Sequence, residues 1–222
     1  MTPRVVAATE DDIGTLSAVI AAAFLDMPPS RWLISDATAR RKIFPAYFGI
    51  HVEHVLALGI VHTTKERDAA ALWLPVPAEP PPVLAGYLRR LTAITSPWTS
   101  RFLAFDAALD ASHPAGQPHQ YLAILAVRPG QQGQGTGTAL LEFRHAELDR
   151  QGRSAYLEAS SERSRDLYLR HGYRPRPGAP FHLPDDGPPM WPMMRQPDPR
   201  AGNRTGSASA RRPDPGASDD RS

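Results

Sequence analysis

One run of residues constrains the fold of this 222-residue chain more than any other. Three glycines alternate with polar residues in Gln132-Gly133-Gln134-Gly135-Thr136-Gly137. The run follows an apolar segment, Gln120–Val127, with the length of a buried strand, and it precedes a helical pattern over Thr138–Gln151. Glycines at such a junction let successive backbone N–H groups approach an anion, and the helix dipole favours negative charge there. The sequence therefore predicts a phosphate or pyrophosphate site between a strand and a helix.

The segments after this helix continue the same unit. Ser154–Ala159 alternates between apolar and polar residues as a strand does, and Ser161–His171 has the pattern of a short helix that Gly172 ends. The order strand, glycine turn, helix, strand, helix is a βαβα unit.

The chain before this unit predicts further helices and a hairpin. Thr9 and Asp12 form a capping-box-like pair at the start of a helix that ends before Met27. A second helix lies within about 37–58, where Pro45 bends or delays it. The apolar runs 59–63 and 69–74 read as paired strands around a polar turn, and helical patterns occupy 83–94 and 98–110.

The end of the chain has a different composition. From Pro197 to Ser222 the only apolar residues are four alanines, so this segment cannot bury enough surface to offset its ordering entropy. We predict one domain over residues 1–196 and a disordered polar tail over 197–222.

Composition excludes several classes of protein. No apolar stretch approaches the roughly 18 residues of a membrane span, and the N-terminus lacks a signal-peptide pattern. The net charge of +2 gives no basic footprint for nucleic acid. The absence of cysteine excludes disulfides, cysteine nucleophiles and thiolate metal sites, and it fits a reducing compartment. We expect a cytoplasmic protein without a nucleic-acid or membrane partner, and without a metal, since His51 and His54 lack a third ligand at suitable spacing.

The spacing of the glycines separates the families that bind phosphate in this way. A P-loop requires a lysine after its last glycine, and the only lysines here are Lys42 and Lys65. The dinucleotide pattern G-x-G-x-x-G, counted from Gly133, places its third glycine at Thr138. Glu158 does lie 25 positions beyond Gly133, near the place of a ribose-binding acid, so a dinucleotide-binding oxidoreductase stays an alternative.

A third pattern fits better. The strand end Val127-Arg128-Pro129 followed by Gln132–Gly137 resembles the acyl-CoA signature [Gln/Arg]-x-x-[Gly/Ala]-x-[Gly/Ala] of the GNAT N-acetyltransferase superfamily. The run Leu167-Tyr168-Leu169-Arg170-His171-Gly172-Tyr173 resembles the helix of that family in which a tyrosine precedes a Gly-[Phe/Tyr] pair by four residues. The resemblance is sharp over residues 119–173 and diffuse over 3–196.

Within the superfamily, the chain resembles the puromycin N-acetyltransferase type most. The segments that carry this resemblance are Ala21–Phe24 with Pro28 and Arg31, Tyr156–Ser160 and Met190–Met193.

The resemblance implies a fold and a reaction. The fold is mixed α+β, with a central, mostly antiparallel twisted sheet flanked by helices and the βαβα unit as the acyl-CoA site. The reaction is transfer of an acetyl group from acetyl-CoA, the co-substrate, to a primary amine of a small molecule.

The resemblance also implies roles for individual residues. The backbone of Leu125, Ala126 and Val127 pairs with the pantetheine arm. The pyrophosphate is held by the amides of Gln132, Gly133, Gln134, Gly135, Thr136, Gly137 and Thr138. Ser164 replaces an asparagine that in the family bonds the CoA arm, and a serine hydroxyl is shorter.

Two side chains are the candidates for proton transfer. By the resemblance Tyr168 is the general acid, because a phenol with a pKa near 10 is protonated at neutral pH and can protonate the departing thiolate. On the residues alone, Tyr168 can also simply pack beside Leu167. Glu158, a lone acid in an apolar strand, is the candidate base or else the partner of a structural salt bridge. Tyr156 shares its face of the strand.

Three further points stay open at this stage. The acceptor is alternatively a protein lysine or N-terminus, and the chain is alternatively a non-catalytic acyl-CoA-binding module. An aromatic set in the first two helices and the segment between them either lines an acceptor site or forms core: Phe24, Trp32, Phe44, Tyr47 and Phe48. His113 and His119 flank the apolar strand and titrate in a suitable range for a base, but single histidines of this kind are more often surface residues.

Overall fold

The structure is a computed structural model, and it describes residues 3–78 and 86–200. The helices are α1 (Ile13–Phe24), α2 (Pro28–Leu33), α3 (Ala37–Leu58), α4 (Tyr87–Thr95), α5 (Thr99–Ser112), α6 (Thr136–Arg150) and α7 (Glu162–Arg170), and a short 3-10 turn, Glu10–Asp12, precedes α1. The strands are β1 (Val5–Ala7), β2 (Ile60–Thr64), β3 (Ala69–Val76), β4 (His119–Val127), β5 (Ala155–Ala159), β6 (Arg174–Pro175), β7 (Phe181–His182) and β8 (Pro189–Arg195).

The strands form one sheet in the order β1-β2-β3-β4-β5-β8-β6, and β7 pairs with β8 beside it. Every neighbouring pair is antiparallel except β4 and β5, which are parallel. This confirms the predicted mixed fold with a mostly antiparallel sheet.

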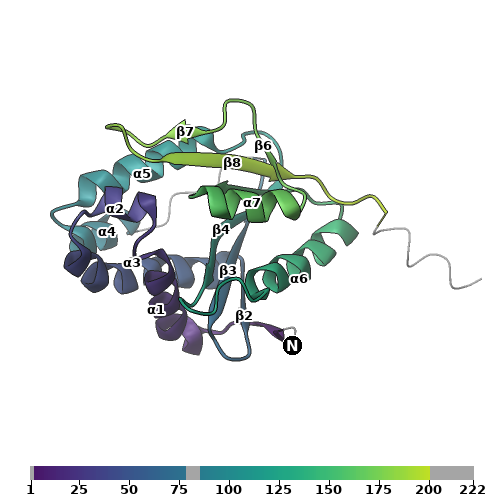
Figure 1. Ribbon diagram of the computed structural model, residues 1–222, viewed down its shortest axis with the longest axis horizontal. Coiled ribbons are helices and arrows are strands. Elements are labelled where there is room, and N and C mark those ends of the chain that lie inside the picture. Colours follow the sequence, from purple (N-terminus) through teal and green to yellow (C-terminus); the bar gives the residue numbers. More distant parts are fainter. Residues whose placement is uncertain (1–2, 79–85, 201–222) are drawn as a thin grey trace, which may run out of the picture.

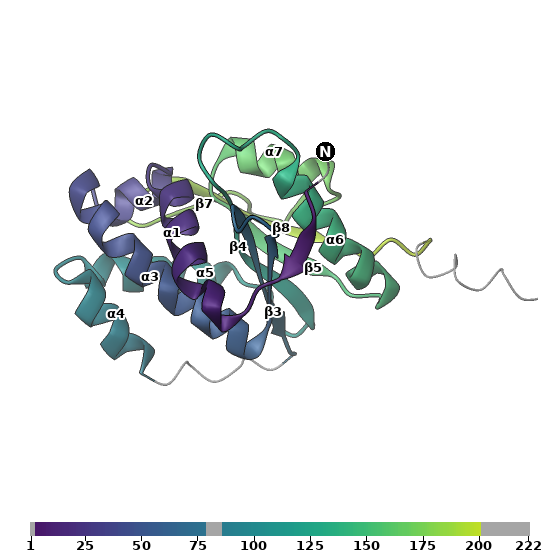
Figure 2. The same cartoon turned by 90° about the horizontal axis from the view of Figure 1, so that it is seen from below.

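Helices cover both faces of the sheet (Figures 1 and 2). One core cluster joins α1 and α3 to the β3–β4 face through residues such as Leu16, Phe44 and Leu72. The second cluster joins α6 and α7 to the opposite face, with Leu141, Trp73 and Leu157 among its buried members. The alternation along β3 and β4 sends successive side chains to these two cores.

The sheet opens at its centre, and this opening creates the site. β4 pairs with β5 only at Gln120 and Tyr121, so the rest of β4 has no strand on that side. On its other side β4 pairs with β3 throughout, but the register shifts after Leu72, which leaves Ala123 as an extra residue on β4. Such a bulge bends a strand and redirects its backbone. The second half of β4 therefore faces a gap between itself and β5.

Most predicted elements are confirmed, with corrections at their ends. The capping box of Thr9 and Asp12 is present, and Pro45 lies inside α3. The helix predicted from Thr138 begins at Thr136, because Gly135 adopts a left-handed conformation (φ 88°) as its N-cap.

The predictions missed the three short strands β1, β6 and β7 and two longer elements. One is α2, where Pro28 and Pro29 occupy first-turn positions that need no N–H donor. The other is β8, whose Pro189 and Pro192 argue against an inner strand. Part of the helix predicted over 83–94, namely 83–85, and part of the predicted tail, 201–222, lie outside the described residues.

Within residues 3–78 and 86–200, no helix combines the length and the apolar character that crossing a membrane requires.

Gly59 ends α3 where the chain turns sharply into β2, and it offers a test of this packing. A Cβ at this position would lie 2.1 Å from the backbone oxygen of Trp73, which the sheet holds in place. Gly59→Ala is therefore expected to lower the free energy of unfolding by about 3 kcal/mol, measured by chemical denaturation. Gly14→Ala is the matched control, because a Cβ there in α1 meets no atom within 4 Å; it should be neutral or raise stability by up to about 1 kcal/mol. Equal stabilities of the two variants would contradict the packing described here.

Candidate active site

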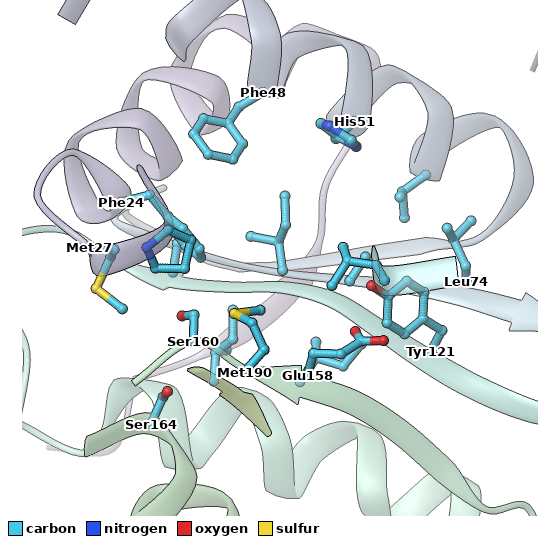
Figure 3. A pocket seen from close by; sticks show the side chains of 18 of the residues that line it. Phe24, Met27, Phe48, His51, Leu74, Tyr121, Glu158, Ser160, Ser164 and Met190 are labelled. Carbon is cyan, nitrogen blue, oxygen red and sulfur yellow. The ribbon is translucent and has the colours of Figure 1, made fainter. Parts of the chain in front are cut away.

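A single cavity of about 1210 Å³ runs through the gap between β4 and β5. Its lining includes the glycine turn before α6 and residues of α1 and α3. Figure 3 shows Phe48 and His51 on one side of the cavity and Glu158 and Met190 on the other. Eleven of the thirteen predicted site residues line it: Leu125, Ala126, Val127, Gln132, Gly133, Gly135, Gly137, Thr138, Glu158, Ser164 and Tyr168. Gln134 and Thr136 belong to the same turn but do not line the cavity.

The glycine turn is built from backbone conformations that side chains disfavour. Gly130, Gly133 and Gly135 have φ values of 85°, 81° and 88°. Gly137 has an ordinary φ, but it leaves room beside Val127 and Leu125, whose side chains lie 3.8 and 3.9 Å from where its Cβ would be. The first turn of α6 has N–H groups without intrahelical acceptors, which is the geometry that an anion site requires.

Side chains support this turn. The Gln132 side-chain amide donates to the Val127 carbonyl at 3.3 Å, and that of Gln134 donates to the Gly130 carbonyl at 3.3 Å. Arg163 of α7 brings its guanidinium group to within 3.9 Å of the Cβ position of Gly133. Sequence reasoning missed Arg163, because its approach to the turn depends on the packing of α7.

Tyr168 lies on α7, is 7% exposed and lines the cavity. Its ring packs edge-on against Tyr173 with the centroids 5.6 Å apart. Burial raises the pKa of the Tyr168 phenol above its usual value, so the hydroxyl keeps its proton at neutral pH. The Tyr168 side chain is thus a packing residue whose phenol is protonated at neutral pH and lies on the cavity wall.

Glu158 lies on β5 with a side chain that is 3% exposed. Its Oε1 has no hydrogen-bond partner among the described residues, and His113 Nδ1 lies 3.8 Å from it. Burial raises the pKa of Glu158 to about 7, and the phenols of Tyr156 and Tyr121 partly offset that rise. A carboxyl group with this pKa exchanges protons readily near neutrality. In Figure 3, Glu158 and Tyr121 direct their oxygen atoms into the same part of the cavity.

Ser164 lines the cavity but already has partners. Ser161 is the N-cap of α7, and its Oγ accepts a hydrogen bond from the Ser164 backbone N–H. Ser164 Oγ accepts from the Ser161 N–H at 3.1 Å and donates to the Ser161 carbonyl at 2.9 Å. Its hydroxyl proton is therefore engaged in capping the helix.

Part of the cavity wall is aromatic and acidic. Phe24, Phe44, Tyr47 and Phe48 line the cavity and also pack in the core, so their core role is confirmed, while their role in an acceptor site stays a prediction. Trp32 does not line the cavity; its Nε1 donates to the Pro184 carbonyl at 3.0 Å.

One face of α5 supplies two acidic side chains to the cavity wall. Asp106 and Asp110, four residues apart, both line the cavity, and His113 follows on the same face. Tyr87 donates a hydrogen bond of 2.8 Å to Asp106 Oδ2. Burial, with a smaller effect from Asp110, raises the pKa of Asp106 to about 6. The helical spacing of Asp106, Asp110 and His113 was a usable signal, but nothing in the sequence indicates which face of α5 meets the cavity.

His113 and His119 are not surface residues. His119 is 3% exposed and His113 lies at the cavity wall beside Glu158. His51 and His54 of α3 also line the cavity. Among residues 3–78 and 86–200, no group of three or more acidic, histidine or cysteine side chains is arranged to hold a metal ion.

Comparison with known proteins is consistent with this geometry. Residues 102–175 match the family described as acetyltransferase (GNAT) domain. A solved structure described as histone acetyltransferase HPA2 and related acetyltransferase, from Corynebacterium glutamicum, is 28% identical, with a TM-score of 0.66, and the match covers 89% of this chain and 98% of that one.

Two more distant structures share the fold. Arylalkylamine N-acetyltransferase 2 from Aedes aegypti is 12% identical, with a TM-score of 0.62 and 88% and 99% of the two chains covered. A chain of the NatC complex, solved with Gag peptide and CoA, is 12% identical, with a TM-score of 0.52 and 89% and 100% covered. The fold of this chain is therefore that of the GNAT acetyltransferases, and its residues 102–175 match the acetyltransferase domain of that superfamily.

Proposed function

We propose that this protein transfers an acetyl group from acetyl-CoA to a primary amine of a small molecule. The observation that carries the proposal is the cavity that joins the glycine turn before α6 to Glu158, whose Oε1 has no hydrogen-bond partner among the described residues, with the Tyr168 phenol on the cavity wall. Acetyl-CoA is an elongated anion, and it suits the end of the cavity where the helix dipole and Arg163 are positive. A cationic acceptor suits the part of the cavity that acidic side chains line.

The cofactor end has the groups that the diphosphate of CoA needs. The first amides of α6, with the dipole of that helix, attract its negative charge, and Arg163 adds a cation beside Gly133. Along the free side of β4, the backbone of Leu125–Val127 is available to pair with the pantetheine arm and to polarise the thioester carbonyl. Ser164 lines the cavity where its hydroxyl would contact the CoA arm more weakly than an asparagine does. Such a contact would compete with the hydrogen bonds that Ser164 makes to Ser161.

The acceptor end favours a positively charged amine. Its charged lining residues are Asp106, Asp110 and Glu158, and the neighbouring rings offer faces to a cation. Glu158 takes a proton from the ammonium group, which leaves a neutral amine with a free electron pair. The amine nitrogen then forms a bond to the thioester carbon, the carbon–sulfur bond breaks, and Tyr168 gives its proton to the thiolate. The nitrogen gives up its second proton to the Tyr168 phenolate, which leaves a neutral amide, and Glu158 releases its proton to solvent.

The cavity also favours one acceptor class over another. Phe24, Phe44, Tyr47 and Phe48 enclose the acceptor end in part, which suits a compact aromatic amine better than a protein chain. The resemblance to puromycin N-acetyltransferases makes puromycin the first amine to test. Release of free CoA with puromycin would support that class; release with other small amines alone would reject puromycin and keep the acetyltransferase; and release with histone or N-terminal peptides alone would favour the protein acceptor.

The anion site can be tested by calorimetric titration with acetyl-CoA. The wild-type chain should bind about one molecule per chain, and Gly135→Val should weaken binding at least tenfold, because valine cannot adopt the φ of 88° that presents the amides. Gly152→Val is a matched control, since Gly152 also has a positive φ (63°) but lies after α6 outside the cavity. Gly152→Val should lose about as much stability as Gly135→Val and still bind acetyl-CoA. Absence of binding by the wild type, or tight binding of a nicotinamide dinucleotide instead, would overturn the proposal.

A further inference from the structure

Two histidines, His119, which is buried, and His113, which is partly exposed, lie between Glu158 and a backbone carbonyl group, and their contacts define which nitrogens carry protons. His119 Nδ1 lies 2.8 Å from the Gln117 carbonyl oxygen. A carbonyl oxygen only accepts hydrogen bonds, so His119 carries its proton on Nδ1. Burial lowers the pKa of His119, which keeps the ring neutral at pH 7. The Nε2 atom of His119 is therefore an unprotonated acceptor.

The same reasoning extends to His113. Its Nε2 lies 2.9 Å from His119 Nε2, so one of the two nitrogens must donate, and only His113 has a proton to give. Burial, together with His119 and Arg176, lowers the pKa of His113 to about 4, and this ring is neutral as well. With its proton on Nε2, His113 turns an unprotonated Nδ1 towards Glu158 Oε1 at 3.8 Å.

We propose that His113 is a positioning residue: His119 and Gln117 fix its tautomer so that its Nδ1 accepts a hydrogen bond from Glu158 once Glu158 has taken the proton of the acceptor amine. The N–H bond of the ammonium breaks as the Oε1–H bond of Glu158 forms, and the proton remains on Oε1. The two lone pairs that face each other before the transfer disfavour the carboxylate, and the hydrogen bond formed afterwards stabilises the acid. This inference rests on the proposed role of Glu158 as base.

The surroundings hold this arrangement in place. The His113 ring packs edge-on against both Tyr121 and Tyr156, with centroids 4.9 and 4.7 Å away. The Tyr156 hydroxyl donates to the Ser112 carbonyl at 3.1 Å, and Arg176 donates to the same oxygen at 2.8 Å. Five charged or titratable groups surround Glu158 and His113: Tyr121 on β4, Tyr156 on β5, Asp110 on α5, His119 and Arg176. Among these groups, only His119 forms a hydrogen bond with the His113 ring.

The test uses a residue that does not touch Glu158. In His119→Phe the acceptor for His113 Nε2–H is lost, so His113 is free to place its proton on Nδ1 and donate to the Glu158 carboxylate. The pKa of Glu158, followed by ¹³C NMR of its carboxyl carbon, should then fall by at least one unit from about 7. The acid limb of the pH profile of kcat/KM should move to lower pH by the same amount. His119→Gln should restore wild-type values, because its amide can donate to Gln117 and accept from His113.

Controls separate this effect from a general disturbance. His62→Phe replaces another buried histidine, on β2 and outside the cavity, and should leave the Glu158 titration unchanged. In a His113→Phe background, the further change His119→Phe should have no effect on the pKa of Glu158. The wild-type protein gives an independent readout through ¹⁵N shifts of the two rings, which should show His113 protonated on Nε2 and His119 on Nδ1.

Two results would overturn the inference: a His113 ring protonated on Nδ1, or an unchanged Glu158 titration in a folded His119→Phe variant. Neither readout requires turnover. A protein that titrates as described but acetylates no amine would keep the histidine arrangement and reject the proposed function. A protein that acetylates amines but has the opposite histidine tautomers would keep the proposed function and reject the histidine arrangement.

Discussion

Glu158→Gln is expected to lower kcat/KM for the acceptor amine by about 100-fold to 1000-fold, with the affinity for acetyl-CoA unchanged. Glutamine has the shape of glutamate but cannot take a proton from the ammonium group. The wild-type rate should rise with pH through about 7, because Glu158 acts only when ionised and burial places its pKa there. In the variant this acid limb should disappear from the residual activity. The measurement is the release of free CoA over pH 5.5–9, alongside a binding titration.

A matched change elsewhere controls for the loss of a negative charge. Glu142→Gln, on the exposed face of α6, removes the same charge outside the cavity and should keep both the rate and its pH dependence. If Glu158→Gln retained the wild-type rate and acid limb, Glu158 would not be the base, and Asp106 would become the next carboxyl group to test.

The same substitution should affect stability with a defined sign. The folded state raises the pKa of Glu158 from 4.5 to about 7, so it binds this proton more tightly than the unfolded chain does. The resulting contribution to stability is complete below pH 4.5 and is lost as the pH rises through about 7. Above pH 7 the Gln variant should therefore exceed the wild type in its free energy of unfolding, by about 3 kcal/mol at most. A variant that is less stable at every pH would show that the carboxylate has a structural partner.

Tyr168→Phe should lower the single-turnover rate of acetyl transfer by about 100-fold or more while acetyl-CoA still binds. Phenylalanine keeps the ring that packs against Tyr173 and removes only the hydroxyl proton. Without this proton the thiolate must leave as an anion in a largely apolar cavity, which raises the barrier. Single-turnover conditions are chosen because slow product release would otherwise mask the chemical step.

Tyr173→Phe makes the same change five residues along the chain. Tyr173 is buried, bonds His145 at 3.1 Å and does not line the cavity, so this variant should retain the wild-type transfer rate. A Tyr168→Phe protein with an unchanged rate would leave Tyr168 with its packing role alone. If neither variant nor wild type turned over any amine while all bound acetyl-CoA, the chain would be a binding module.

The glycine turn before α6 was predictable because its backbone conformation depends on neighbouring residues alone. A run of glycines after an apolar strand and before a helix determines the backbone conformation within a few residues, and the alternating pattern of the Glu158 strand indicates its faces in the same way. The start of α6 was wrong by two residues because glycine was treated as part of the loop, whereas Gly135 is the N-cap. β8 was missed because Pro189 and Pro192 oppose strand formation, while its pairing with β5 on one side and β6 on the other overrides that preference.

The sequence by itself determined the class of fold, the place of the glycine turn and two candidate side chains, because each depends on short-range periodicity and turn chemistry. Only the tertiary structure decided that β4 and β5 separate after Tyr121, and that this gap joins the turn to Glu158. It also decided which face of α5 meets the cavity, and that His113 and His119 stand behind the carboxyl group. These features arise from contacts between segments far apart in the chain, where the local pattern of residues carries no information about which surfaces meet.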